Sequence, residues 1–289
     1  MSKGSLFWAN ASGKLGESVF YRAGGEQRNR TYVKNIKNPK TKAQMSNRIQ
    51  MLNLTTTFKL LADILRVSFP NRSAKESGFN AFVKANKSAT SSVNLKSNIE
   101  EGIVAPYQYF VSQGDLIVPQ PSVITTKDNK TVYGYQMNDG NDQDEMPSSW
   151  FRNLVSSLGL PEGTKITIIK GTYVDEGWKL AYAIYGSTMT SGEPIVSGEP
   201  IAVTLETVGD DTTGNVMSFG DSLEENLLAV IFSYTDANGK LKVNTAQLRA
   251  MTADGISSHA EDFKGPDGFV YQQVLEAYGY NQNSVLSTK

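Results

Sequence analysis

Cysteine is absent from this chain of 289 residues, and histidine occurs only once, as His259. Without cysteine the protein has no disulfide, no thiolate zinc site and no cysteine nucleophile. His259 follows two serines and precedes Glu261 and Asp262, but a Ser-His-Asp relay needs three groups that converge from different elements. We therefore expect His259 to be an ordinary residue of a surface loop, and we assign no catalytic residue.

Long apolar runs and phosphate-binding motifs are also missing. No segment approaches the roughly 20 apolar residues of a membrane-spanning helix, and the start, MSKGSLFWANASGK, lacks the apolar run of a signal peptide. Neither G-x-x-x-x-G-K-[ST] nor a G-x-G-x-x-G after a strand occurs. We expect a protein that folds in a cytoplasm, does not contact a membrane and carries no nucleotide cofactor.

The one segment that suggests a metal site is acidic. Residues 138–146, NDGNDQDEM, lack the alternating ligands and the sixth-position glycine of an EF-hand. We interpret this segment as a solvated loop, with adventitious Ca²⁺ as the alternative. Carboxylate pairs for glycoside cleavage stay open, because any acidic β protein contains carboxylates at many separations. We predict a protein that is not an enzyme and holds no metal or cofactor.

Charge is divided unevenly along the chain, although the net charge is −1. Residues 1–96 hold 17 Lys and Arg against 4 Asp and Glu, whereas residues 97–289 hold 11 against 25. Such asymmetry indicates that the basic part meets an acidic partner, such as nucleic acid, a membrane surface, a protein or a neighbouring copy. Two solvated halves are the simpler alternative. Nucleic acid is disfavoured, because the acidic part would repel a polyanion and no zinc finger or RRM signature occurs.

Residues 1–37 form what we term the N-terminal arm. Two β-prone runs, Val19–Arg22 and Arg30–Lys34, flank a Gly-Gly pair that permits the positive φ angles of a tight hairpin. Because an isolated hairpin is marginal in water, we expect this one to gain order on another surface or to fold back on its own domain. The expected contact residues are Phe7, Trp8, Phe20, Tyr21, Arg28 and Arg30.

A long helix is predicted from Lys42 to Val67. Asn38-Pro39 ends what precedes it, Thr41 and Gln44 match a capping box, and apolar residues then recur every three or four positions. The free amides of a helix N-terminus attract anions. We therefore expect an anion-binding face formed by Lys40, Lys42 and Arg48.

The rest of the chain changes from helix to strand. Ser73 and Glu76 repeat the capping box and predict a second helix that folds back on the first, and residues 88–98 read as a linker. About seven β-branched and aromatic runs follow, which favours a β-sandwich, with helices near Ser148–Leu158 and Phe269–Tyr278. The predicted class is α+β: a hairpin arm and long helix pair (1–98), then an Ig-like or jelly-roll-like sandwich (99–289).

The first third of the chain resembles a family of proteins from Bacteroidetes genomes and their crAss-like phages. The resemblance rests on two segments, GKLGESVFYRAGGEQRNRTYVKNIKNPKTKAQMSNRIQMLN and SGFNAFVKAN. The rest of the chain resembles the family only in being rich in predicted strands. The matching positions are Gly13, Gly16, Asn38, Pro39, Thr41, Ala43, Gln44, Arg48, Phe79, Asn80, Phe82, Val83 and Lys84.

The resemblance implies a virion component, most simply an auxiliary protein that decorates the capsid, and implies no catalytic residue. Its partners would be the major capsid protein or other virion proteins, with self-contacts in the particle, and its location the virion. A ring or tail-adapter protein is the alternative in the same class. A carbohydrate-binding or adhesin module is the alternative from another class, and it would use Trp178, Tyr182 or Tyr185 as exposed aromatics.

Overall fold

The computed structural model divides, between Thr41 and Lys42, into two compact units. The described residues are 12–23, 25–34, 41–87, 96–104, 107–137, 147–174, 177–186, 195–197, 201, 203–207, 215–221 and 226–250. The expected acidic loop, His259, the helix near Phe269–Tyr278 and most of the linker lie outside them. We call the first unit the N-terminal sheet and the second unit the body.

The N-terminal sheet has three antiparallel strands in the order β1-β2-β3. They are β1 (Gly13–Leu15), β2 (Ser18–Ala23) and β3 (Glu26–Thr31). Gly16 (φ 59°) and Gly25 (φ 80°) occupy the turns, where a positive φ suits glycine. The predicted hairpin is confirmed, but its second strand is Glu26–Thr31 and not Arg30–Lys34. Strand β1, which the sequence did not suggest, extends the hairpin.

Seven antiparallel strands form the larger sheet of the body. Their order is β10-β9-β8-β13-β14, with β4 beside β9 and β16 beside β13. Because side chains alternate across a strand, the apolar run from Leu227 to Phe232 on β13 enters two different cores in turn. The strands are β4 (Ile103–Val104), β8 (Lys165–Val174), β9 (Gly177–Gly186), β10 (Ile195–Ser197), β13 (Asn226–Thr235), β14 (Leu241–Val243) and β16 (Arg249–Ala250).

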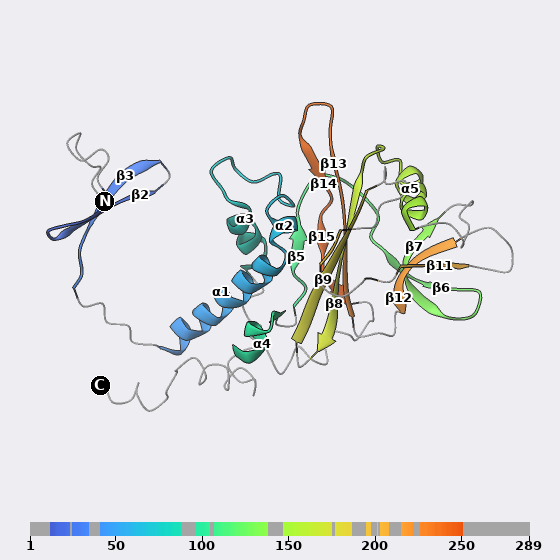
Figure 1. Ribbon diagram of the computed structural model, residues 1–289, viewed down its shortest axis with the longest axis horizontal. Coiled ribbons are helices and arrows are strands. Elements are labelled where there is room, and N and C mark those ends of the chain that lie inside the picture. The colour runs from blue at the N-terminus through green and yellow to red at the C-terminus, as the bar shows by residue number, and fades with distance from the viewer. Residues whose placement is uncertain are drawn as a thin grey trace. The chain divides into compact units, whose positions relative to one another are not determined.

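A helical layer covers one face of this sheet (Figure 1). Leu54, Leu65 and Phe82 from the helices share a core with Ile169, Trp178 and Leu227 from the strands. The helices are α1 (Lys42–Leu60), α2 (Ala62–Leu65) and α3 (Gly78–Ala85), and α4 (Lys96–Glu100) leads into β4. The short strands β5 (Phe110–Ser112) and β15 (Ala246–Gln247) pair with each other.

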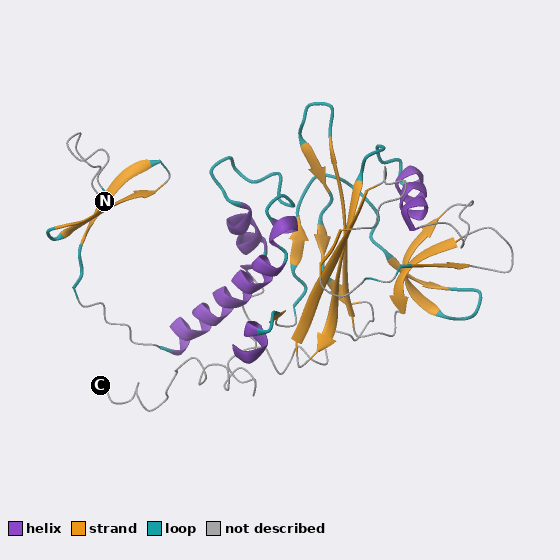
Figure 2. Cartoon of the chain, in the orientation of Figure 1, coloured by secondary structure: helices purple, strands orange, loops and turns teal. Residues whose placement is uncertain are grey.

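A four-stranded sheet and one helix pack on the other face (Figure 2). The order of this smaller sheet is β11-β12-β7-β6. Tyr135, Met217 and Phe219 from it share a second core with Ile166 and Phe232 from the larger sheet. The elements are β6 (Ser122–Thr125), β7 (Thr131–Met137), α5 (Pro147–Ser157), β11 (Thr204–Thr207) and β12 (Asn215–Asp221).

The predicted α+β class with a long helix pair is wrong. The described chain is mostly β, in several antiparallel sheets, and α3, the partner expected for the long helix, has only 8 residues. The body therefore has three layers: helices, the larger sheet, and the smaller sheet with α5. The division between the two units falls at Lys42, so the expected boundary at residue 98 lies inside the body.

Both helix predictions in the first third need correction at their ends. The long helix is interrupted at Leu61, after three consecutive threonines, two of which return their hydroxyls to carbonyls one turn back; such back-bonding bends helices. The second helix begins after Ser77, whose hydroxyl accepts from the Asn80 amide at 3.2 Å, and not at Ser73. The helix predicted over Ser148–Leu158 is confirmed as α5.

Candidate interaction surface

One face of the N-terminal sheet gathers positive charge around tyrosine. Tyr21 lies directly opposite Arg28, and Val19 lies between Arg30 on one side and Lys14 on the other. Residues opposite each other on neighbouring strands share a face. The face therefore carries Lys14 from β1 and Arg28 and Arg30 from β3. We call it the cationic face.

The cations of this face are held by weak, solvent-exposed contacts. Lys14 Nζ lies 3.8 Å from the centroid of the Tyr32 ring, a cation–π contact of about 0.5–1 kcal/mol at an exposed site. Arg28 Nη2 lies 3.6 Å from Glu26 Oε2, and these side chains are 39% and 56% exposed. An exposed pair of this kind is worth about 0–1 kcal/mol, so the guanidinium can exchange this carboxylate for one on a partner.

The opposite face carries Phe20 at its centre. Phe20 and Asn29 lie opposite each other there, and Phe20 is only 8% exposed. Of the residues predicted as contacts, Tyr21, Arg28 and Arg30 thus share the cationic face, whereas Phe20 belongs to the other one. Phe7 and Trp8 lie outside the described residues.

The predicted cations at the start of the long helix belong to the body. The helix begins at Lys42, as its sequence predicts, and Arg48 is exposed, with Nη1 donating to Met45 Sδ at 3.7 Å. Lys40 and the side chain of Lys42 lie outside the described residues. Of the nine predicted contact residues, the structure thus describes five side chains: Phe20, Tyr21, Arg28 and Arg30 in the N-terminal sheet, and Arg48 in the body.

Sequence reasoning missed Lys14 of the cationic face and Tyr32, whose ring contacts it. Tyr32 could have been found, because it continues the alternation of Arg28 and Arg30. Lys14 could not, because its place depends on the pairing of β1 with β2, and Gly13–Leu15 carries no β-prone run.

A pocket of about 490 Å³ lies in the body between the helical layer and the strands. Arg72 lines it, and its Nε and Nη1 donate to the carbonyls of Glu76 (3.1 Å) and Phe69 (2.9 Å). Two further lining residues are joined by a hydrogen bond, in which Asp115 Oδ1 accepts from Asn71 Nδ2 at 2.6 Å. These polar groups hold the loop that follows α2, and the pocket mixes both signs of charge, so we assign it no ligand.

The aromatics that a carbohydrate-binding module would use are in the cores. Trp178 is fully buried, and Tyr182 and Tyr185 are each 7% exposed. Tyr185 stacks on Phe151 at a centroid distance of 4.1 Å, and burial raises the pKa of its hydroxyl. None of the three offers an exposed ring for a sugar, so the expectation that they are exposed is wrong.

Metal-binding clusters and membrane-spanning helices are both absent from the described part of the chain. No group of three or more His, Asp or Glu side chains there is placed to hold a metal ion. In the same part of the chain, no helix combines the length and apolar character needed to cross a membrane.

Comparison of the chain with protein-family models, with curated proteins and with solved structures found no match.

Proposed function

We propose that this chain is a non-enzymatic structural protein of a bacteriophage virion, most simply an auxiliary protein that binds the capsid lattice through its basic N-terminal part. The observation that carries the proposal is the cationic face. Lys14, Arg28 and Arg30 lie on one face of a small sheet that is a compact unit apart from the body. The resemblance of the first third of the chain to crAss-like phage proteins supports the same role.

Electrostatics favours an acidic protein surface as the partner. The cationic face supplies two guanidinium groups, and arginine pairs with carboxylates through two parallel hydrogen bonds. A nucleic acid would also attract these cations. However, residues 97–289 carry an excess of 14 acidic over basic side chains, and they would be brought close to any polyanion that the N-terminal part bound.

The test is incorporation into particles. Phage in which Lys14, Arg28 and Arg30 are all changed to glutamate should contain few or no copies of the protein per purified virion. A matched variant changes three exposed lysines of the body, Lys59, Lys75 and Lys87, to glutamate and should retain the wild-type copy number. An unchanged copy number in the first variant would refute docking through the cationic face.

A ring or tail-adapter position remains the alternative, because it would use the same cationic face. The two positions differ in where the protein lies in the particle. Imaging of purified virions with the protein labelled should place copies over the whole shell for the auxiliary protein, and at one vertex for a ring or adapter protein.

A further inference from the structure

The edge strand β6 of the smaller sheet is largely exposed. It pairs with β7 in a regular register from Ser122↔Gly134 to Thr125↔Thr131, and no strand among the described residues pairs with its outer side. Val123 is 55% exposed, Ser122 and Thr125 are exposed, and Ile124 is half-buried. Figure 1 shows β6 at the margin of the body.

The hairpin turn determines which backbone groups of β6 point outward. The Thr126 amide donates to the Lys130 carbonyl at 2.8 Å, so these two residues form a hydrogen-bonded pair. Hydrogen-bonded and non-hydrogen-bonded pairs alternate along an antiparallel ladder. Ile124 therefore turns its N–H and C=O toward β7, whereas Val123 and Thr125 turn theirs away from the sheet.

This edge lacks most of the features that protect edge strands. Proteins usually place a charged side chain, a bulge or a proline on such a strand. The sequence of β6 is SVIT, its pairing with β7 has no bulge, and the nearest charge is Lys127, beyond its end. Only its start is protected, by Pro119 and Pro121. Ile117, a few residues earlier, is 96% exposed.

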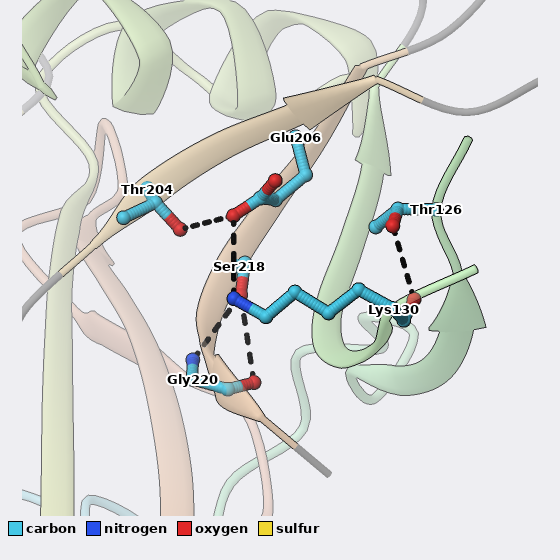
Figure 3. Close-up of polar contacts among 6 residues, drawn as sticks. All are labelled: Thr126, Lys130, Thr204, Glu206, Ser218 and Gly220. Carbon is cyan, nitrogen blue, oxygen red and sulfur yellow. Dashed lines mark hydrogen bonds and ion pairs between the residues drawn. The ribbon is translucent and has the colours of Figure 1, made fainter. Parts of the chain in front are cut away.

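The hairpin that presents β6 is held in place. Thr126 Oγ1 donates to the Lys130 carbonyl at 3.0 Å, and Lys130 Nζ lies 3.8 Å from Glu206 Oε1 on β11 (Figure 3). Thr204 Oγ1 donates to the same carboxylate at 3.2 Å. Lys130 thus reaches from the β6–β7 turn to the opposite edge of the sheet, and this partly exposed ion pair adds at most about 1 kcal/mol to the hydrogen bonds of the turn.

We propose that β6 pairs with β6 of a second copy, antiparallel, about a two-fold axis at Ile124. In this register Val123 lies opposite Thr125 of the second copy, and the reverse, so every outward backbone group of these residues finds a partner. Ile124 meets Ile124 of the second copy as a non-hydrogen-bonded pair, in which side chains are closest. The interface is isologous, as in most two-fold dimers.

Sequence favours this register and a second copy as the occupant. A two-fold axis at Val123 would place Pro121 opposite Thr125, and proline has no N–H to donate. With the axis at Ile124, no like charges face each other: Lys127 lies opposite Pro121 and Asp128 opposite Gln120. Two copies of β6 in this register therefore satisfy each other's backbone hydrogen bonds and bring no like charges together.

The absence of cysteine makes a direct test possible, since one introduced thiol reports one contact. Ile124→Cys in the full-length protein should form a disulfide-linked dimer under mild oxidation, because the Cα spacing of about 4.5 Å in such a pair suits a disulfide. Val123→Cys is the matched control, because its side chain lies on the other face and opposite Thr125. Val33→Cys, on an exposed side chain of the N-terminal sheet, reports random collision.

We expect Ile124→Cys to cross-link at least about tenfold faster than either control, since only that pair meets the geometric requirement. Sedimentation equilibrium of the unmodified protein should show a dimer, and Thr125→Lys, at an exposed position, should shift it toward monomer with an unchanged far-UV circular dichroism spectrum. Equal cross-linking rates, faster linkage at Val123→Cys, or a monomer at every concentration would overturn the proposal. These results are independent of docking through the cationic face.

Discussion

Asn86 and Phe110 are joined by two hydrogen bonds between a side chain and the backbone. Asn86 Nδ2 donates to the Phe110 carbonyl at 2.9 Å, and the Phe110 amide donates to Asn86 Oδ1 at 2.8 Å. The side chain of Asn86, at the end of α3, thus forms with β5 the same two hydrogen bonds that the backbone of a neighbouring strand would form. It also donates to the Phe82 carbonyl at 3.0 Å and is fully buried.

Replacing Asn86 should therefore loosen the attachment of the helical layer to the strands. Asn86→Ala leaves two groups of Phe110 without their partner, and each buried unpaired group costs about 1–3 kcal/mol, so we expect a loss of about 3 kcal/mol in the free energy of unfolding. Urea denaturation followed by circular dichroism measures it. Asn71→Ala removes an exposed hydrogen bond to Asp115 and should cost less than about 1 kcal/mol. Equal costs would contradict the bridging role of Asn86.

Gly134 on β7 should not tolerate a side chain. A Cβ there would lie 2.0 Å from the Met217 carbonyl oxygen on β12, and a backbone atom cannot rotate away. Gly134→Ala should lower the free energy of unfolding by about 3 kcal/mol, as overpacking does. Gly239→Ala is the control, because its Cβ would meet nothing within 4 Å but its φ is +75°, and that conformation costs about 1–2 kcal/mol. A smaller loss at Gly134 than at Gly239 would contradict the close approach of β7 and β12.

Stability should fall in alkali because buried tyrosines resist ionisation. Burial raises the pKa of Tyr109 and of Tyr135 above the usual 10. Above pH 10 the unfolded chain loses these protons while the folded chain keeps them. The free energy of unfolding is therefore unaffected by these tyrosines below pH 10. Above pH 10 it decreases by about 1.4 kcal/mol per pH unit for each such group.

Tyr135→Phe tests this explanation. At pH 7 the variant should be less stable by about 1 kcal/mol, because the hydroxyl donates to the Pro119 carbonyl at 3.1 Å. At pH 11 the deficit should disappear or reverse, because phenylalanine has no proton to lose. Urea denaturation at both pH values measures the difference. A deficit that stays the same would show that Tyr135 ionises as readily in the folded protein as in the unfolded chain.

Charge reversal at the start of the long helix tests the second basic group. Changing Lys40, Lys42 and Arg48 to glutamate should reduce the copies of the protein in purified virions, if this end binds an anionic partner. Misfolding would be a poor explanation, because a glutamate at Lys42, in the first turn of the helix, should stabilise it by about 0.3–1 kcal/mol, and Arg48 is exposed. The melting temperature of the purified variant checks this. An unchanged copy number would remove these three residues from the docking surface.

The sequence predicted those elements whose pattern is local. The β-branched runs of β8, β9 and β13, the apolar spacing of α5 and the Gly-Gly turn of the N-terminal sheet each predict their own element. In contrast, β12 reads NVMSFGD, with Gly, Asn and Asp that favour turns; it becomes a strand because β7 and β11 pair with it on both sides. Its existence is decided by tertiary context.

The placement of the helices shows the same limit. Their apolar stripes predict burial but do not indicate against what, so the sequence reading paired the helices with each other. The structure confirms that α3 contacts α1, because the Phe58 ring meets the rings of Phe79 and Phe82. It also packs the helices on the larger sheet, where Leu54 and Leu65 share a core with Leu227. For the candidate surface, alternation places Arg28 and Arg30 on one side of a strand, but Lys14 needed a strand register that no local pattern encodes.

The helical layer is synthesised before some of the strands that cover it. The ribosome makes the helical layer early, but β13, whose residues Leu227 and Ile231 help to cover it, emerges much later. Until then the growing chain exposes the apolar side of α1 and α3, and exposed surface of this kind promotes aggregation. We expect N-terminal fragments that stop before β13 to be insoluble and to attract chaperones.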